Sequence, residues 1–230
     1  MTKTINLGVL GIDHGHIFDM LDEMLKEGCS CNYFWTEGSP LTLDEFSKKY
    51  PQIKRVDNKS DILNDDTIDM ILISSIPKDR ANLSIDAMKA GKDVMVDKPG
   101  CTTLEQLNNL KQTVKDTGKI WSINFSERFH VAAVTKAEEL VAEGKIGKVK
   151  QTIGTGPHRQ GNYERPDWFY DRDSYGGIIT DIGSHQIHQF LVFTNSNEAK
   201  VNHALVENTT KKEFVGFQDF GEVNLTGSGG

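Results

Sequence analysis

The sequence predicts an α/β fold with a doubly wound parallel sheet, followed by an α+β region with a mainly antiparallel sheet. In the first half, short apolar strands alternate with helical stretches, which is typical of a parallel sheet covered by helices on both faces. The first strand ends in a glycine turn that opens a helix. After Asn202 the pattern changes to short strands and turns. We therefore expect two domains, residues 1–124 and 125–230.

The elements of the first half have local signals at their boundaries. Apolar residues three and four apart between Ile17 and Leu25 predict a helix that stops at Gly28. Pro77 can open a helix at its first turn, and Thr102 matches the cap of a capping box. The expected strands are 5–11, 29–35, 69–73, 94–96 and 120–125, and the expected helices lie at about 17–27, 43–50, 77–90 and 102–117.

The second half begins with helical segments and ends with strands. A helix is expected at 131–143 and a second at 178–193, separated by a loop at 156–177 that is rich in glycine, proline and aromatic residues. The expected strands are 149–155, 203–207, 214–218 and 222–225.

Composition and charge limit the partners that this chain can have. The 230 residues carry a net charge of −7 without a basic cluster, which argues against nucleic-acid binding. No apolar run reaches membrane-spanning length, and the N-terminus lacks a signal segment. The three cysteines, an odd and sparse number, fit a reducing compartment. We expect a cytoplasmic protein with neither nucleic-acid nor membrane partners.

The turn after the first strand has an altered dinucleotide fingerprint. Such a turn needs glycines where the backbone approaches a pyrophosphate that rests on the helix N-terminus. Gly11 keeps the first position, whereas Asp13 replaces the second glycine and Gly15 stands one residue early. We assign these residues to a cofactor site, which His14 and His16 could also line. The alternatives are a tight turn that binds nothing, and histidines that cap the helix or lie on the surface.

Residues after the other strands complete the expected cofactor site. Glu37 stands near the spacing at which an acid binds the adenosine ribose, and Thr36 is the second candidate. No arginine lies beside them in the sequence to hold a 2′-phosphate, so we expect NAD rather than NADP. Ser75 and Pro77, after the strand at 69–73, and Asp97 and Lys98, after the strand at 94–96, are assigned to the same site.

A second group of residues suits proton transfer on a hydroxyl group. Asp181 and His185 stand four residues apart, so a helix would stack the carboxylate and the imidazole on one face. A carboxylate in this place orients the imidazole and raises its basicity. Lys98 follows an apolar strand, between Asp97 and Pro99. The alternatives are a helix-face ion pair and a surface lysine.

Other polar residues could surround a substrate. We assign Arg128, His158 and Trp168 to substrate binding together with His185, although Arg128 could instead pair across the domain junction and Trp168 could belong to the core. Three further residues of the long loop region also suit a sugar face through stacking and hydrogen bonds, namely Arg159, Tyr163 and Tyr175.

A metal site is the alternative use of the second-half histidines. Asp181, His185 and His188 could bind a metal together. We interpret His188 as a packed or supporting histidine, and we expect no metal.

Five motifs follow one another along the chain: Gly8–Gly15, Asp97–Pro99, Phe125–Phe129, Glu143–Gly147 and Gly176–His185. Together they resemble the Gfo/Idh/MocA family (glucose-fructose oxidoreductase, inositol dehydrogenase and rhizopine catabolism proteins), over essentially the whole chain. The resemblance implies a dinucleotide-binding Rossmann domain at 1–124 and a substrate and oligomerisation domain at 125–230. It also implies NAD(P)-dependent chemistry on sugars, polyols or related compounds.

The resemblance also places individual residues. The family's catalytic aspartate and histidine fall on Asp181 and His185, and the lysine of its Glu-Lys-Pro motif falls on Lys98, with Asp97 in place of the glutamate. The chain ends at Gly230, short of the usual family length, so either it is a fragment or the second sheet is completed in another way. Because the open sheet of this domain often forms the oligomer interface in the family, we expect a homo-oligomer.

The predicted function is hydride transfer between nicotinamide and a hydroxyl-bearing carbon of a sugar, polyol or related small molecule. His185 would take the hydroxyl proton, Asp181 would orient His185, and Lys98 would stabilise the developing negative charge. Lys98 could instead be the base. The alternative functions are an NAD-dependent glycosidase that acts by transient oxidation and elimination, and a non-catalytic nucleotide-sensing regulator on the same fold.

Overall fold

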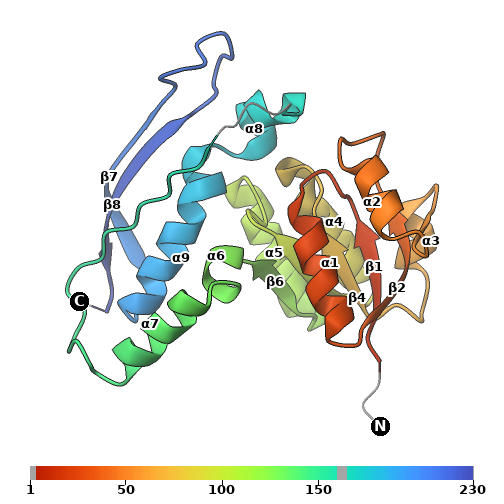
Figure 1. Cartoon of the computed structure of the whole chain (residues 1–230), viewed down its shortest axis with the longest axis horizontal. Coiled ribbons are helices and arrows are strands. Elements are labelled where there is room, and N and C mark those ends of the chain that lie inside the picture. Colours follow the sequence, from red (N-terminus) through yellow and green to blue (C-terminus); the bar gives the residue numbers. More distant parts are fainter. Residues whose placement is uncertain (1–3, 160–164, 230) are drawn as a thin grey trace. The chain divides into compact units, whose positions relative to one another are not determined.

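The first unit of the chain is a six-stranded parallel sheet between two layers of helices (Figure 1). The computed structural model describes residues 4–159 and 165–229. It divides into two compact units; the first ends at Asn124 and also includes Asp173–Gly176, and the remaining residues form the second. The elements of the first unit are β1 (Asn6–Leu10), α1 (His16–Lys26), β2 (Ser30–Trp35), α2 (Leu43–Lys49), β3 (Lys54–Arg55), α3 (Lys59–Leu63), β4 (Met70–Ile73), α4 (Pro77–Lys89), β5 (Asp93–Asp97), α5 (Leu104–Thr117) and β6 (Trp121–Asn124).

The strand order β3-β2-β1-β4-β5-β6 confirms the predicted doubly wound sheet. All five pairings are parallel, and Val9, Leu72 and Met95 lie in register across its centre. The direction of winding reverses between β1 and β4. In such sheets a ligand binds outside the carboxyl ends of the strands at this point, which here is where the turn after β1 lies.

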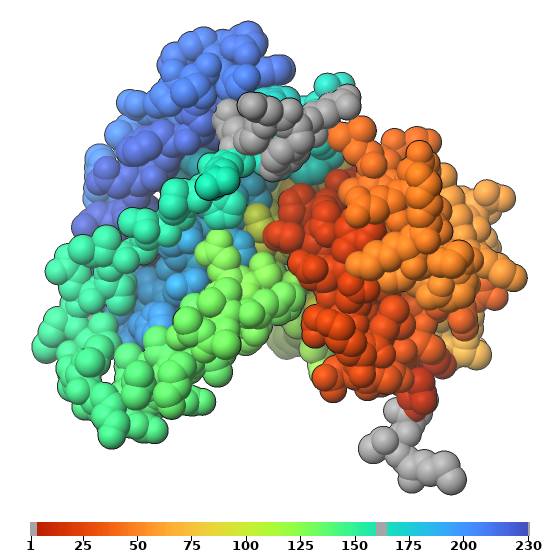
Figure 2. Space-filling model, in the orientation of Figure 1, coloured from red at the N-terminus to blue at the C-terminus, as the bar shows by residue number. Residues whose placement is uncertain are grey.

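Alternation along the strands builds a core on each face of the sheet. Leu7 and Val9 of β1 pack with α1 and α2, whereas Leu10 packs with α4 and α5 on the opposite face. Because β1, β4 and β5 are buried on both faces, their apolar runs are nearly continuous. Figure 2 shows α1 and the segment around α2 side by side on the surface of the first unit, in red and orange.

The second unit consists of helices and a two-stranded antiparallel sheet, as the sequence predicts in outline. The strands β7 and β8 pair from Ala199 with Gly227 to Glu207 with Phe220. No helix in residues 4–159 and 165–229 is long and apolar enough to cross a membrane. α8 (Arg172–Tyr175) lies mostly in the first unit. The remaining elements are α6 (Ser126–Phe129), α7 (Ala132–Ala142), the 3-10 helix η1 (Asp167–Tyr170), the π-helix η2 (Ile179–Gly183), α9 (Ser184–Phe193), β7 (Ala199–Glu207) and β8 (Phe220–Gly227).

Two predicted strands of the second half are wrong. Residues 149–155 and 214–218 form no strand. The first segment lines a cavity together with β8, and among the described residues β8 pairs with β7 alone. In the second segment the Phe214 ring stacks on Tyr170 with the ring centroids 4.0 Å apart. The backbone carbonyl of Phe214 accepts a hydrogen bond from the side-chain amide of Asn208. These contacts hold the segment as a turn.

The predicted helix cap before α5 is displaced by one residue. Thr103, not Thr102, is the cap, and its hydroxyl accepts from the backbone amide of Gln106 at 3.1 Å. The Gln106 side chain accepts in return from the backbone amide of Thr102 at 2.8 Å. The two bonds form a variant of a capping box, in which Gln106 takes the role expected of Glu105 and accepts from the residue before the cap.

Candidate functional site

The turn between β1 and α1 depends on a glycine. Gly11 has φ +79°, and a Cβ atom there would lie 2.4 Å from the Cβ of Ser75 and 2.7 Å from its Cα. The Gly11 amide donates to the carbonyl of Trp35 at 2.7 Å, and its carbonyl accepts from the amide of Ser74 at 3.2 Å. The ends of β1, β2 and β4 are therefore held together at the carboxyl edge of the sheet.

The start of α1 leaves room for an anionic ligand. A Cβ atom built on Gly15, the residue before the helix, would meet no atom within 4 Å. The 11 residues of α1 direct a positive dipole end toward this space. This open approach to a helix N-terminus fits the pyrophosphate of a dinucleotide.

The buried Asp97 carboxylate connects this turn to the end of β5. Its two oxygens lie 3.0 Å from His14 Nδ1 and 2.8 Å from His16 Nδ1, and the Arg80 guanidinium lies 3.0 Å away. Burial alone would raise the pKa of Asp97, but Arg80 and the histidines hold the pKa well below its usual range. Since an ionised carboxylate only accepts hydrogen bonds, each imidazole carries its proton on Nδ1.

Arg80 of α4 fixes the loop that carries Lys98. The side chain is 1% exposed, and its Nε donates to the carbonyl of Ser75 at 2.8 Å. One terminal nitrogen also donates to the carbonyls of Asp97, Lys98 and Pro99. Lys98 itself is 3% exposed and precedes a cis peptide bond to Pro99. Sequence reasoning missed Arg80, because nothing local distinguishes a buried arginine on a helix from a solvated one.

His14, His16 and Asp97 have the donor types of a metal site, and their donor atoms lie within 4.8 Å of one another. The Arg80 cation on the same carboxylate opposes a second cation there. Both Nδ1 atoms are also already directed at carboxylate oxygens. The arrangement fits a hydrogen-bonded network rather than a metal site.

Asp13, in the place of the second glycine, is a half-buried acid among other acids. Its pKa is raised to about 6, mainly by burial and also by the nearby Asp79 and Glu37, against the lowering effects of its own backbone amide and Arg80. Near neutral pH a fraction of Asp13 is therefore protonated in the free protein.

The expected ribose site holds an arginine that the sequence analysis did not anticipate. Thr36 is 2% exposed and Glu37 is exposed, directly after β2. Arg55 of β3 donates to the carbonyls of Thr36 and Gly38 at 3.0 and 2.7 Å. The inference that no arginine lies there is wrong, because the neighbouring strand supplies it. The buried Thr36 hydroxyl has no hydrogen-bond partner within the described part of the chain, which leaves it available to a ligand.

Ser75 and Pro77 lie at the same edge of the sheet. Ser75 follows β4 and is 5% exposed, in contact with the Gly11 turn as described above. Pro77 is the first residue of α4, as the sequence predicts. Every candidate cofactor residue of the first unit therefore belongs to a segment that follows β1, β2, β4 or β5.

Asp181 and His185 lie in the second unit on a helix that is not regular. The chain is a π-helix over Ile179–Gly183 and an α-helix from Ser184, so Asp181 and His185 stand on opposite sides of this change. Gly177 makes the entry possible, since a Cβ there would lie 2.6 Å from side-chain atoms of Arg172 and Gln218. The predicted helix is confirmed, but the stacking of a regular α-helix does not apply between these two residues.

The surroundings of His185 and His188 differ. His185 is 2% exposed, with the Phe125 ring 6.0 Å away in an edge arrangement. The His188 ring lies 4.2 Å from Phe125, and its Nε2 is 3.4 Å from the Arg128 guanidinium. Burial, followed by the Arg128 charge, lowers the pKa of His188. A packed, neutral His188 beside a cation fits a supporting role.

The structure gives Arg128 and His158 partners within the second unit. Arg128 makes a bidentate ion pair with Glu138, at 2.5 and 2.9 Å. His158 is exposed, and its Nε2 lies 3.5 Å from Glu127. Their roles toward a substrate stay predictions.

The aromatic residues of the loop region are placed differently from one another. Trp168 is half-buried on η1, where its ring lies 6.3 Å from Phe169. Tyr175 is 2% exposed and belongs to the first unit. Arg159 is exposed, and Tyr163 lies outside the described residues.

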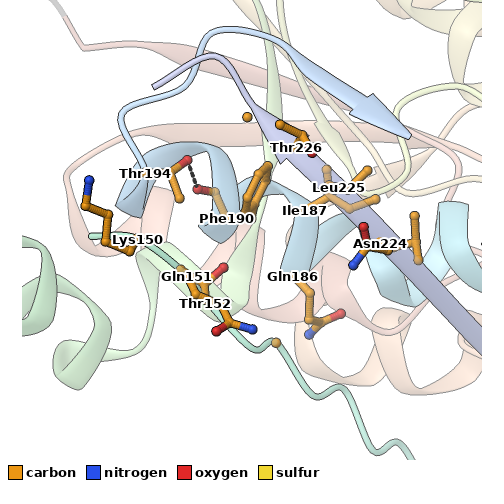
Figure 3. Close-up of a pocket in the computed structure, with 13 residues that line it drawn as sticks. Lys150, Gln151, Thr152, Gln186, Ile187, Phe190, Thr194, Asn224, Leu225 and Thr226 are labelled. Atoms are coloured by element: carbon orange, nitrogen blue, oxygen red, sulfur yellow. Dashed lines mark hydrogen bonds between the residues drawn. The ribbon is translucent and has the colours of Figure 1, made fainter. Parts of the chain in front are cut away.

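A cavity of about 340 Å³ opens in the second unit (Figure 3). It lies between Lys150–Gly154, one side of α9 and the end of β8. Thr194 at its border donates to the carbonyl of Phe190 at 2.7 Å. Neither Asp181 nor His185 lines it. The catalytic candidates are thus divided: Lys98 belongs to the first unit and the Asp181 and His185 pair to the second, and their meeting across a crevice stays a prediction.

Comparison with protein families agrees with this architecture. The model of the GFO/IDH/MocA oxidoreductase family, NAD-binding Rossmann fold, matches residues 40–125, and the GFO/IDH/MocA C-terminal domain matches residues 134–230. The chain belongs to the Gfo/Idh/MocA oxidoreductase family. The resemblance seen in the five sequence motifs is therefore confirmed.

The match to a curated relative shows what share of that protein's length this chain covers. It is 24% identical over 194 residues to scyllo-inositol 2-dehydrogenase (NADP(+)) of Bacillus subtilis strain 168, covering 82% of this chain and 51% of that protein. The chain thus spans about half the length of this curated relative.

Solved structures of similar proteins match over nearly the whole chain. A protein of Erwinia carotovora atroseptica SCRI1043 described as an oxidoreductase is 38% identical, with a TM-score of 0.95 over 99% of this chain and 68% of that one. A levoglucosan dehydrogenase in complex with NADH and levoglucosan is 19% identical, with a TM-score of 0.83 over 98% of this chain and 64% of that one. At 19% identity, the similarity to the levoglucosan dehydrogenase shows only a shared fold.

Proposed function

We propose that this protein is an NAD(P)-dependent oxidoreductase that moves hydride between nicotinamide and a hydroxyl-bearing carbon of a sugar, polyol or related compound. One observation carries the proposal. The carboxyl edge of the first sheet brings together an open helix N-terminus at Gly15, the ribose candidates Thr36 and Glu37, and the buried Lys98. Phosphate, ribose and reacting-centre contacts therefore follow one edge, as a dinucleotide requires.

The residues have distinct roles in this proposal. The cofactor, when bound, accepts or supplies the hydride. Lys98 donates a hydrogen bond to the substrate oxygen as negative charge develops. His185 accepts the hydroxyl proton, and Asp181 orients the imidazole. Arg80 and Asp97 hold the backbone on both sides of Lys98, so the ammonium is presented from a fixed loop.

The choice of cofactor depends on two side chains after β2. An exposed Glu37 carboxylate favours a ribose with a free 2′-hydroxyl, and we therefore propose NAD. Arg55 opposes this preference, because a guanidinium at the same loop can approach a 2′-phosphate. The names of the similar proteins include both NADP(+) and NADH. Arg55→Ala should weaken NADPH binding more than NADH binding, by several-fold.

The substrate class and the assembly rest on the relatives. The Bacillus relative is named for an inositol and the levoglucosan dehydrogenase for an anhydrosugar, so we propose a sugar or polyol substrate. We also propose a homo-oligomer formed through the β7–β8 sheet. Its apolar side chains Val201, Leu205 and Phe220 are 58%, 40% and 43% exposed, which is unusual for strand residues that face no partner.

The test is binding followed by turnover. NADH fluorescence titration should show binding, and a panel of inositols, xylose and levoglucosan with NAD⁺ should show NADH formation at 340 nm. His185→Ala should lower kcat by on the order of a hundred- to ten-thousand-fold with nearly unchanged NADH affinity. His130→Ala, at the exposed end of α6, is the matched control and should leave both unchanged.

The alternative functions predict other results. Release of a leaving group from glycosides without net NADH formation would indicate the glycosidase. Binding of NADH without turnover of any compound would indicate the nucleotide sensor. Normal turnover in His185→Ala would remove that residue from the mechanism.

A further inference from the structure

The last residue of β6 carries a buried amide group without a hydrogen-bond partner. Asn124 is 8% exposed, and its buried Nδ2 atom donates to no group in the part of the chain that the structure describes. A buried donor that lacks an acceptor destabilises a fold, so native proteins keep few of them. Such an atom at the carboxyl edge of the sheet points to a ligand that brings the acceptor.

The pairing of β6 with β5 places this amide beside the loop of Lys98. Asn124 lies in register with Asp97, the residue before Lys98, in a parallel pair of strands. Ile123 packs into the core on the α4 and α5 face, so Asn124 projects to the opposite face, where α1 begins. Asp97 projects to the same face, because its carboxylate lies 2.8 Å from Nδ1 of His16, the first residue of α1. The two side chains are therefore neighbours at the edge of the sheet.

The order of the strands indicates which part of a dinucleotide would reach Asn124. The ribose candidates Thr36 and Glu37 follow β2, the open helix N-terminus at Gly15 follows β1, and Lys98 follows β5. In the sheet these strands stand in the order β2-β1-β4-β5-β6. A dinucleotide with its adenosine at β2 and its diphosphate at the start of α1 directs its nicotinamide toward β5 and β6. Asn124 thus belongs to the nicotinamide end of the proposed site.

The chemistry of an asparagine side chain matches the polar group of nicotinamide. That group is a carboxamide, with one oxygen that accepts and one NH₂ group that donates. Asparagine offers the complementary pair, since Nδ2 donates and Oδ1 accepts. The neighbouring Asp97 carboxylate only accepts, and it already lies within 3.0 Å of His14, His16 and Arg80. Lys98 has donors alone. Of these three neighbouring residues, Asn124 is the one that can serve both ends of a carboxamide.

We propose that Asn124 binds the nicotinamide carboxamide of the cofactor, with Nδ2 donating to the carboxamide oxygen and Oδ1 accepting from its NH₂ group. No covalent bond changes. The two hydrogen bonds hold the ring against rotation about its bond to the ribose, and hydride transfer requires such a fixed orientation. This inference rests on the proposed function, because it concerns the cofactor of that site.

Asn124→Leu tests the proposal on the whole chain, because it keeps the approximate size of the side chain and removes both hydrogen-bonding groups. Calorimetric titrations compare NADH with ADP-ribose, which keeps the adenosine, the diphosphate and both riboses but lacks nicotinamide. The dissociation constant of NADH should rise by about fivefold or more, and that of ADP-ribose should change by less than about twofold. The melting temperature without ligand should equal or exceed that of wild type, since the variant removes an unpaired buried donor.

Asn108→Leu, the same change at an exposed position on α5, is the matched control and should leave both dissociation constants unchanged. If Asn124→Leu does not fold, Asn124→Ala replaces it with the same expected contrast between the two ligands. If the wild type prefers NADPH, then NADPH and 2′-phospho-ADP-ribose form the pair.

Equal losses of affinity for the two ligands would assign Asn124 a structural role and overturn this inference, as would an unchanged affinity for NADH. Both results would leave the proposed function standing. Failure of the wild-type protein to bind NADH, NADPH and ADP-ribose would instead overturn the proposed function itself.

Discussion

The two units use an arginine and a carboxylate in different ways. In the first unit, Arg80 and Asp97 are 1% and 0% exposed and join α4 to the loop that carries Lys98. In the second unit, Arg128 and Glu138 are 22% and 25% exposed and join α6 to α7. An arginine–carboxylate ion pair thus belongs to the core in the first unit and lies at the surface in the second unit. Only the buried pair leaves an uncompensated charge when one partner is removed.

The sheets of the two units also differ in how deeply their strands are buried. In the first unit each central strand has a neighbour on both sides and helices on both faces, so Ile71 is fully buried. In the second unit β7 is exposed along its whole length, and Val201 is 58% exposed. Within the described chain, the central strands of the first unit have pairing partners on both sides. The second unit exposes strand edges and apolar side chains that a neighbouring chain could cover.

The largest expected effect is on the buried ion pair. Arg80→Met should destabilise the first unit by about 3–5 kcal/mol, because the Asp97 carboxylate remains buried without its partner. Arg128→Met, the matched change in the second unit, should cost about 0–1 kcal/mol. Thermal and urea unfolding followed by circular dichroism give both values.

Equal losses for these two arginine variants would contradict the contrast between the units. If Arg80→Met does not fold, Arg80→Lys provides the comparison. It keeps the charge but loses the forked contacts to the carbonyls on both sides of Lys98, so it should fold and still be less stable than wild type.

Shortening one apolar side chain in each sheet tests this difference in burial. Ile71→Ala should destabilise the first unit by about 2–5 kcal/mol, since it leaves a cavity between β4 and the helices on that face. Val201→Ala on β7 should change stability by less than about 0.5 kcal/mol in the monomer. A clear loss in Val201→Ala that grows with protein concentration would indicate that β7 is covered in an oligomer.

A substitution of Asp13 in the first unit should increase stability instead of lowering it. The folded pKa of Asp13, about 6, lies above the ordinary 3.8, so the folded state binds this proton more tightly than the unfolded state. Ionised Asp13 therefore destabilises the fold, with no effect below about pH 4 and the full effect above about pH 6. Asp13→Asn should stabilise the protein by about 1–3 kcal/mol at pH 7.5 and leave it unchanged at pH 4. A loss of stability at both pH values would contradict the account of Asp13.

The fold of the first unit could be predicted because its signals are local. Apolar runs such as Met70–Ile73 are buried on both faces, and glycines such as Gly28 and Gly118 follow the helices that they end. The short elements β3 and α3 were not predicted, because two and five residues carry too little pattern. The cap of α5 was misplaced because adjacent threonines offer the same side chain.

The remaining features depend on contacts between distant residues. Segment 149–155 has the composition of a strand, but a strand needs a neighbour, and a cavity separates it from β8. Arg55 reaches the ribose loop from 19 residues away, and Arg80 of α4 pairs with Asp97, 17 residues later at the end of β5. Local sequence contains neither relation. The candidate residues of the site stay predictions from the sequence, and the network of Arg80, Asp97 and the two histidines is seen only in the structure.

Hydrogen–deuterium exchange with and without NADH tests the central claim most directly, namely that the carboxyl edge of the first sheet is the cofactor site. We predict slower exchange in peptides that cover residues 11–17, 36–38 and 74–77, and no change in β7 and β8. Protection confined to 150–154 and 223–227, around the cavity of the second unit, would contradict the claim, as would unchanged exchange throughout at saturating NADH.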